Sequence, residues 1–440
     1  MARRGRHVPL SVRLNDRLVG QLAKASSGAI SFKYDDSWLQ WENALPISLS
    51  LPLREDDYRG DAVSAVFDNL LPDSVGLRRQ VAERVGAESA DGYSLLAAIG
   101  RDCVGALQFL PEGEDPASSP DASPAGINGE SLDDGAIEAL LKTLGQAPLG
   151  LSRDDHFRIS VAGAQEKTAL LFHDGRWLKP RATTPTTHIF KTPITRLPNG
   201  IDLSNSVENE YYCLRLMKAF GLPAAEAEVR MFGEAKALVG ERFDRRWTRT
   251  GRLLRLPQED FCQALSIPPS RKYQSDGGPS FVDCLRLLAG SDRPATDQQT
   301  IMKAQLLFWL IGATDGHAKN FSIFLAPGGA YRLTPLYDVL TAQPSLDTGE
   351  IEPNQFRLAM SVGKSRHFRM HEILGRHFRQ SGEAAGLPAR LVGQAIDEIA
   401  QSADAALDLV ANALPADFPG QIHQSVSGGV KARLARLAGE

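Results

Sequence analysis

A carboxylate and a carboxamide five positions apart, Asp315 and Asn320, stand in a short glycine-containing segment. The apolar run before them stops at Gly312, so the pattern predicts a loop that follows a buried helix. Kinases use a carboxylate at such a place to accept the proton of an attacking hydroxyl, and an amide oxygen to hold a metal on nucleotide phosphates. Ordinary loop chemistry also produces this spacing, so the interpretation depends on the other elements of the chain.

Residues 157–172 have the pattern of two short strands joined by the small residues Ala162, Gly163 and Ala164. Small side chains at a hairpin tip let backbone N–H groups approach phosphates closely. The segment matches neither the Walker motif nor the usual glycine loop of protein kinases, and a plain β-turn remains the alternative.

One lysine, Lys191, lies among apolar neighbours in a predicted strand, where a kinase places the lysine that pairs with nucleotide phosphates. The alternative is a solvated lysine on an ordinary strand. Glu208 and Glu210 begin the next predicted helix and could pair with Lys191, or could simply stabilise the helix dipole.

Asp338 follows a predicted hairpin downstream of the Asp315–Asn320 loop, where kinases keep a second metal ligand, although a turn aspartate is the alternative. The four elements thus occur in kinase order, and this order favours ATP-dependent phosphoryl transfer with Mg²⁺ bridging phosphate oxygens. Catalysis would consist mainly of positioning and charge neutralisation.

The 440 residues suffice for two or three domains, and 42% hydrophobic and 23% charged residues are ordinary for a soluble globular protein. A net charge of −4 gives no general attraction to nucleic acid, although arginines between residues 245 and 255 surround Trp247 and could form a local basic patch, or a solvated hairpin. Four separated cysteines predict buried thiols. No signal peptide or membrane-spanning run is recognised, so we expect a cytoplasmic protein without membrane contact.

Hydrophobic periodicity predicts a β-rich segment followed by a helical one. Together with the kinase order of the four elements, this favours an α+β fold of bilobal, protein-kinase-like type, with a β-rich N-terminal part and an all-helical C-terminal lobe. We expect a small α+β domain at 1–112, a linker or exposed loop at 113–130, an ATP-binding lobe at 131–262 and a mainly helical lobe at 263–440.

Several longer motifs resemble the HipA family, the serine/threonine-kinase toxins of bacterial HipBA toxin–antitoxin modules. They are FRISVAGAQEKTAL (157–170), ERFDRRW (241–247), LPQED (256–260), IGATDGHAKN (311–320), FDNLLPDS (67–74) and IGRDCVGA (99–106). The resemblance extends over nearly the whole chain and weakens after about Ala359.

The resemblance implies that Asp315 is the catalytic base, that Asn320 and Asp338 hold Mg²⁺, and that Ser160 is an autophosphorylation site whose modification expels the phosphate loop. A phosphoserine carries a charge of about −2, which should repel ATP beside the phosphate site. The residues that would surround ATP are Ala162, Gly163, Ala164, Gln165, Glu166, Lys167, Lys191, Glu241, Arg242, Phe243, His317, Ala318, Lys319, Asn320, Tyr337 and Asp338.

The resemblance also implies an aminoacyl-tRNA synthetase as substrate, chiefly the glutamate enzyme, and a HipB-like helix-turn-helix antitoxin dimer as partner. Phosphorylation would stall translation and promote growth arrest and persistence. Family members can touch operator DNA through the C-terminal lobe, but residues 381–387 here contain Glu383 and no lysine or arginine. DNA association is therefore expected mainly through the antitoxin.

Two other functions are compatible with the sequence. Small-molecule and lipid kinases share the Asp/Asn/Asp arrangement, and an inactive co-repressor would need no catalysis.

Overall fold

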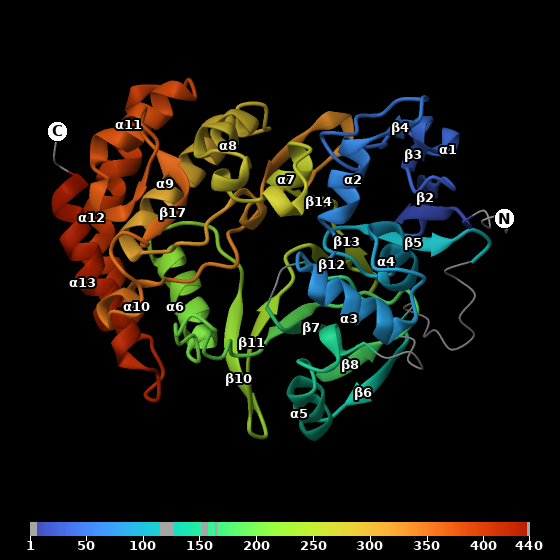
Figure 1. Ribbon diagram of the computed structural model, residues 1–440, viewed down its shortest axis with the longest axis horizontal. Helices are drawn as coiled ribbons and strands as arrows, with labels where there is room; N and C mark the ends of the chain where they lie inside the picture. Colours follow the sequence, from blue (N-terminus) through green and yellow to red (C-terminus); the bar gives the residue numbers. More distant parts are fainter. Residues whose placement is uncertain (1–6, 115–126, 152–156, 163–164, 438–440) are drawn as a thin grey trace. The chain divides into compact units, whose positions relative to one another are not determined.

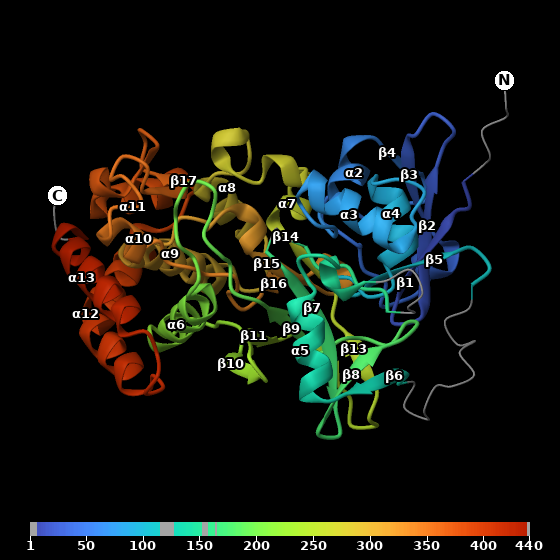
Figure 2. The same cartoon turned by 60° about the horizontal axis from the view of Figure 1, so that its bottom comes forward.

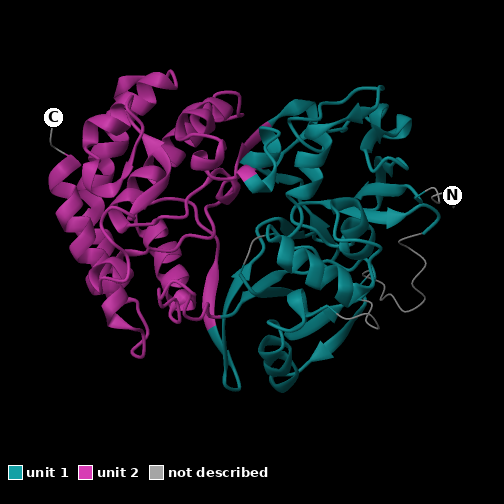
Figure 3. Cartoon of the chain, viewed as in Figure 1, with its two compact units in different colours: residues 1–192, 230–270, 324–330 teal, residues 193–229, 271–323, 331–440 magenta. Residues whose placement is uncertain are grey.

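The computed structural model describes residues 7–114, 127–151, 157–162 and 165–437. The chain forms two compact units (Figure 3), with Met1–Thr192, Arg230–Ser270 and Phe324–Ala330 in unit 1, and Pro193–Val229, Arg271–Ile323 and Tyr331–Glu440 in unit 2. Unit 1 therefore includes the predicted N-terminal domain and most of the predicted ATP-binding lobe. The predicted boundaries at 112, 130 and 262 stay predictions.

The first layer of unit 1 is a five-stranded sheet of order β4-β3-β2-β1-β5. Its strands are antiparallel, and alternate residues such as Leu10, Val12 and Leu14 face the core, as period-2 patterning requires. The strands are β1 Leu10–Leu14, β2 Arg17–Lys24, β3 Ile30–Tyr34, β4 Tyr58–Arg59 and β5 Leu107–Pro111.

Three helices gather on one side of this sheet (Figure 2). Side-chain oxygens of Ser74 and Asp91 cap the second and third of them by accepting backbone N–H groups, so local sequence fixes where these helices begin. They are α2 Asp61–Asp68, α3 Val75–Val85 and α4 Gly92–Ile99, and the short α1 Asp36–Leu39 precedes them.

A second sheet has the order β10-β11-β9-β7-β8-β6. Helix α5 packs Ile137 and Leu141 into the same core as Leu170, Phe190 and Val239 of its strands. The elements are β6 Gly129–Leu132, α5 Asp134–Lys142, β7 Lys167–His173, β8 Arg176–Pro180, β9 His188–Lys191, β10 Ala227–Phe232 and β11 Ala235–Glu241. Unit 1 continues with β12 Arg245–Trp247, β13 Leu253–Arg255, β14 Gln258–Asp260 and α7 Phe261–Ala264.

Unit 2 is mainly helical, and α12 and α13 lie side by side in it (Figure 1). Its helices are α6 Ser206–Ala219, α8 Phe281–Leu288, α9 Pro294–Ile311, α10 Gln343–Asp347, α11 Gly375–Ala384, α12 Ala389–Asn412 and α13 Gly420–Leu437. The strands β17 Arg357–Val362 and β18 His367–Arg369 pair antiparallel, and β15 Ser322–Leu325 and β16 Tyr331–Leu333 flank a turn at residues 327–329.

The predicted α+β, kinase-like fold is confirmed, although the C-terminal part is mainly rather than wholly helical because β17 and β18 form a hairpin. The four cysteines are buried and free, as predicted. Among the described residues, no helix is both long enough and apolar enough to cross a membrane.

Helix α9 carries the segment with which the sequence analysis began. Apolar residues cover it on several sides, and Trp309 at its end is fully buried, which confirms the predicted core helix. Gly312 ends the helix with φ of 75°, and its N–H is bonded to the carbonyls of Phe308 and Trp309. A Cβ at Gly312 would stand 2.5 Å from Cζ of Phe356, so both backbone angle and space require glycine here.

We expect Gly312→Ala to destabilise the protein by about 2 kcal/mol, because it adds a steric clash to a strained φ. Urea denaturation followed by tryptophan fluorescence measures the loss. Gly349→Ala is the matched control, since Gly349 has φ of 76° with open space around it, and should cost about 1 kcal/mol or less. Equal losses in the two variants would contradict the role of Phe356.

Candidate active site

The predicted catalytic carboxylate, Asp315, lies on the loop after Gly312, with a side chain 56% exposed. Its Oδ1 accepts a hydrogen bond of 2.5 Å from the hydroxyl of Tyr273. Nε2 of His317 lies 3.9 Å from the same oxygen. The carboxylate is thus held at one oxygen while most of its surface faces solvent, as a base that must meet a substrate requires.

His317 belongs to the same loop and is buried. Its ring meets that of Tyr273 edge to face, with centroids 4.8 Å apart. Burial lowers the pKa of His317 below its ordinary value, and the nearby Asp315 offsets only part of that effect. The imidazole is therefore neutral at pH 7 and acts as a packing partner of Tyr273.

The carboxamide of Asn320 is locked by its own loop. Its Nδ2 donates to the backbone carbonyl of Asp315 at 2.8 Å, and its backbone N–H donates to the carbonyl of His317. These bonds close a tight turn over Ala318–Asn320. The nitrogen of the carboxamide is used in this way, and Oδ1 is the atom that a metal would need.

The segment with Asp338 lies beside this loop. The hydroxyl of Tyr337 donates to the carbonyl of Lys319 at 3.0 Å and lies 2.6 Å from Oγ of Ser322. Asp338 itself has φ of 58°, in the left-handed region that few non-glycine residues adopt. Strain of this kind is concentrated at functional sites, where surrounding contacts enforce it.

The donor set suits Mg²⁺ better than a metal held wholly by protein. The described residues contain no group of three or more histidine, cysteine or acidic side chains that could form a closed metal site. Mg²⁺ prefers oxygen ligands and usually takes one or two from protein, with water and phosphate oxygens supplying the rest. One carboxylate, Asp338, and one amide oxygen, Asn320, fit that requirement.

In unit 1, the predicted phosphate-binding residues lie around the start of β7. Nζ of Lys167 donates to the carbonyl of Ala162 at 2.9 Å, and Nε2 of Gln165 donates to the carbonyl of Thr192 at 2.8 Å. Lys191 lies on β9 opposite Lys167 of β7 and opposite Leu238 of β11. The structure thus brings Lys167, Lys191 and Gln165 together, while Gly163 and Ala164 lie outside the described residues.

The predicted hairpin around these small residues is only half present. Residues 167–173 form a strand, but the described residues 157–162 do not pair as one. The reason lies in Ser160, whose backbone N–H donates to the carbonyl of Asp102 at 2.9 Å instead of to β7. Its Oγ donates to the carbonyl of Leu70 at 2.6 Å, and the residue is fully buried.

At the end of β11, the exposed Glu241 and the partly buried Phe243 flank Arg242, whose side chain is buried. All three guanidinium nitrogens of Arg242 donate to neighbours within unit 1, among them Asp244 and Asp102. The side chain of Arg242 therefore braces the connector, and the prediction that residues 241–243 contact the nucleotide, chiefly through backbone groups, stays a prediction.

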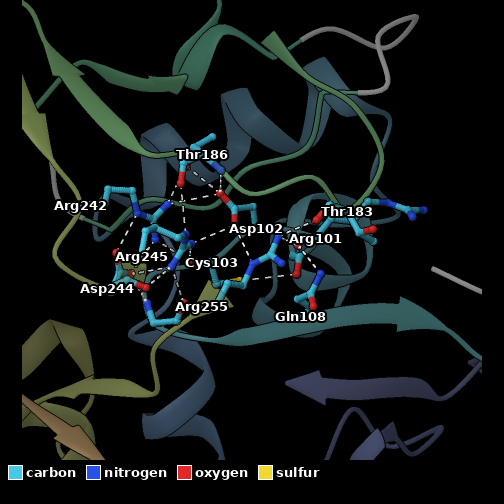
Figure 4. Close-up of polar contacts among 12 residues, drawn as sticks. Arg101, Asp102, Cys103, Gln108, Thr183, Thr186, Arg242, Asp244, Arg245 and Arg255 are labelled. Atoms are coloured by element: carbon cyan, nitrogen blue, oxygen red, sulfur yellow. Dashed lines mark hydrogen bonds and ion pairs between the residues drawn. The ribbon is translucent and has the colours of Figure 1, made fainter. Parts of the chain in front are cut away.

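Two of the arginines between residues 245 and 255 fit neither of the alternatives, a local basic patch or a solvated hairpin. Arg245 and Arg255 are buried and donate to Oδ1 of Asp102 at 2.8 and 2.9 Å, as Figure 4 shows. Burial would raise the pKa of Asp102, but the three arginines Arg245, Arg255 and Arg242 together hold it well below its ordinary value. Arg245 and Arg255 therefore belong to an internal ion network, whereas Arg246, Arg249 and Arg252 are exposed.

Two important residues, Tyr273 and Asp102, were missed from the sequence. Tyr273 lies in a polar loop whose pattern carries no signal for contact with Asp315. A signal existed for Asp102, because a carboxylate between Ile99 and Cys103 in an apolar stretch needs a buried cation.

The two domain models that match this chain describe the same parts. A HipA-like C-terminal domain matches residues 159–407, and a HipA N-terminal domain matches residues 10–110. Together with the kinase-like fold, they define a protein of the serine/threonine-protein kinase class. The chain belongs to the HipA family.

Two relatives match along 90% or more of their own length. The chain is 36% identical over 437 residues to "Putative kinase Y4mE" of Sinorhizobium fredii, covering 98% of this chain and 99% of that protein. It is 29% identical over 419 residues to the serine/threonine-protein kinase toxin HipA of Shewanella oneidensis, covering 92% and 90%. A solved HipA from Shewanella oneidensis, in complex with HipB and operator DNA, matches with a TM-score of 0.78 and 25% identity, covering 97% and 98%.

We expect Tyr273→Phe to lower kcat for phosphoryl transfer about tenfold, because a hydrogen bond that orients the Asp315 carboxylate is lost. KM for ATP should not change. Tyr331→Phe is the control, since it removes one tyrosine hydroxyl bond, to the carbonyl of Leu287, within the same unit. An unchanged kcat in Tyr273→Phe would show that the contact with Asp315 has no catalytic effect.

We expect Asp102→Asn to destabilise the protein by about 3–5 kcal/mol, because three buried arginines lose a carboxylate. Chemical denaturation measures this loss. Asp16→Asn serves as the comparison, since the Asp16–Arg252 ion pair is exposed and should contribute less than about 1 kcal/mol. Similar losses would mean that backbone carbonyls alone hold the arginines.

Proposed function

We propose that this chain is a Mg-ATP-dependent serine/threonine-protein kinase that acts as the toxin of a type II toxin–antitoxin module. The observation that carries the proposal is the loop in which Tyr273 holds one oxygen of Asp315 while the nitrogen of the Asn320 carboxamide donates to the carbonyl of Asp315. A general base and a metal ligand at this spacing are the parts that phosphoryl transfer needs.

In the proposed reaction, Asp315 accepts the proton of a serine or threonine hydroxyl as its oxygen attacks the γ-phosphorus of ATP. Oδ1 is already used by Tyr273, so Oδ2 is the oxygen for the substrate. Asn320 and Asp338 would hold Mg²⁺, which neutralises phosphate charge when bound. The bond from phosphorus to the ADP oxygen breaks as the new one forms.

The remaining proposed ATP contacts are those that the family resemblance implies. Lys191 and Lys167 would neutralise phosphate oxygens, with Ala162, Gln165 and Glu166 supporting the loop around them. The backbone near Glu241 and Phe243 would hold the base. The proposed contacts of unit 2 are His317, Ala318, Lys319, Asn320, Tyr337 and Asp338.

Autophosphorylation of Ser160 would switch the enzyme off. The Ser160 hydroxyl is fully buried and donates to a carbonyl oxygen. A phosphoserine has only acceptor oxygens towards that carbonyl and carries about −2 charge, so it could not keep this position. This incompatibility supports expulsion of the loop after modification.

The proposed protein substrate is an aminoacyl-tRNA synthetase, with glutamate–tRNA ligase as the first one to test, and the proposed location is the cytoplasm, where that substrate is found. The proposed outcome is halted translation, growth arrest and persistence. The proposed partner is a HipB-like helix-turn-helix antitoxin dimer, with which the chain would co-repress its operon. The complex of HipA, HipB and operator DNA from Shewanella oneidensis supports this assembly.

Contact with operator DNA would run mainly through the antitoxin. In unit 2, Lys364 lies 3.3 Å from Glu383, and Arg286 donates to the carbonyl of Ala384. These two cations beside residues 381–387 are engaged with that segment. Phosphate contacts need positive charge, and residues 381–387 themselves contain no lysine or arginine, so this segment favours the indirect mode.

We expect Asp315→Asn to lower phosphoryl transfer about 10²–10⁴-fold and to relieve growth arrest, because the general base is lost. Mass spectrometry of phosphopeptides after expression, with Asp417→Asn as an exposed control in unit 2, measures both Ser160 and synthetase modification. If, on incubation with ATP and a bacterial lysate, the protein transfers phosphate only to small molecules, a small-molecule kinase is favoured. Growth arrest that persists in Asp315→Asn would favour an inactive co-repressor.

A further inference from the structure

Both polar groups of Ser160 are held by one part of the chain. The backbone carbonyl of Asp102 accepts its N–H, and that of Leu70 accepts its hydroxyl. Both acceptors belong to the HipA N-terminal domain of residues 10–110. We call these two carbonyls the Ser160 clamp.

The Asp102 half of the clamp is rigid. Its side chain accepts from Arg242, Arg245 and Arg255 and from the N–H and hydroxyl of Thr186, all buried, as Figure 4 shows. Moving the Asp102 carbonyl would disturb charges that have no access to water, and such a movement is costly. This half therefore fixes the position from which Ser160 must depart.

The Leu70 half is held by a smaller brace. Leu70 follows α2, where Asn69 Nδ2 donates to the carbonyls of Ala65 and Ile267, both at 2.8 Å. Arg78 of α3 donates from Nε to the carbonyl of Pro72 at 2.7 Å and from Nη2 to that of Asp68 at 2.9 Å. One guanidinium thus spans both ends of the turn that presents the Leu70 carbonyl.

We propose that the N-terminal domain controls when Ser160 can be phosphorylated, with Arg78 as the positioning residue of the Ser160 clamp. This inference rests on the proposed autophosphorylation. The Ser160 Oγ must first leave the Leu70 carbonyl; it then bonds to the γ-phosphorus of ATP, the bond to the ADP oxygen breaks, and the hydroxyl proton passes to Asp315. A looser clamp raises the fraction of molecules in which Ser160 is exposed. The kinase then inactivates itself faster.

The first test needs no kinase activity. In full-length Asp315→Asn protein, hydrogen exchange of a peptide covering residues 157–161 reports the N–H of Ser160. Arg78→Ala should speed exchange there by about fivefold or more, because the hydrogen bonds that brace the clamp are lost. Arg79→Ala is the matched control, since Arg79 is the next residue of α3 and its side chain is exposed. Exchange in α9 should not change.

The second test uses active protein. Arg78→Ala should phosphorylate Ser160 about fivefold faster than Arg79→Ala, with an unchanged KM for ATP. Asn69→Ala removes the other side-chain hydrogen bonds that hold this turn and should also speed phosphorylation of Ser160. This second variant keeps the test valid if Arg78→Ala folds poorly.

The two tests separate the possible failures. If the protein without substitutions never phosphorylates Ser160, the proposed switch is wrong. Hydrogen exchange at residues 157–161 then decides by itself whether the Ser160 clamp exists. If Arg78→Ala and Asn69→Ala both exchange at the control rate at residues 157–161, the clamp is overturned even in an active kinase.

Discussion

The buried ion network around Asp102 is the interaction on which unit 1 depends. Three arginines, Arg242, Arg245 and Arg255, and two aspartates, Asp102 and Asp244, lie in it almost without solvent. The extra positive charge is offset by backbone carbonyls, including those of Cys103 and Gly105. Burial lowers the pKa of Arg245 to about 10, which still leaves it protonated at neutral pH. Such a network contributes little net stability but imposes one geometry, because any misalignment leaves a charge unpaired.

That geometry links the two family domains. The loop of Asp102 belongs to the N-terminal domain, whereas Thr186 and Arg242 lie just outside the strands β9 and β11, which carry Lys191 and Glu241. Ser160 is attached to the same loop through the carbonyl of Asp102. The N-terminal domain, for which the sequence indicated no chemistry, thus positions the segment that the proposed kinase would modify.

In unit 2 the corresponding constraint is steric. Helix α9 is buried, and Gly312 turns the chain at its end where a side chain would meet Phe356. The following loop closes on itself through Asn320 and is fixed to the next segment by Tyr337. The positions of Asp315 and Asp338 therefore follow from a helix end and a tyrosine hydroxyl, and Tyr273 holds one oxygen of the Asp315 carboxylate.

The sequence alone determined the kinase-like fold class, the helix α9 with its glycine stop, and the order of Lys191, Asp315, Asn320 and Asp338, because periodicity, capping and spacing are local properties. Only the tertiary structure decided which polar side chains are buried together. The sequence is compatible with a surface patch that contains Arg245 and Arg255, but in the structure both donate to Asp102. Residues 157–162 have the pattern of a strand, but Ser160 donates to the carbonyl of Leu70, which is far away in the sequence. Tyr273 reached Asp315 in the same way. Long-range hydrogen bonds and ion pairs follow no period along the chain, so the Asp315–Asn320 loop could be recognised from sequence while the residues that hold it could not.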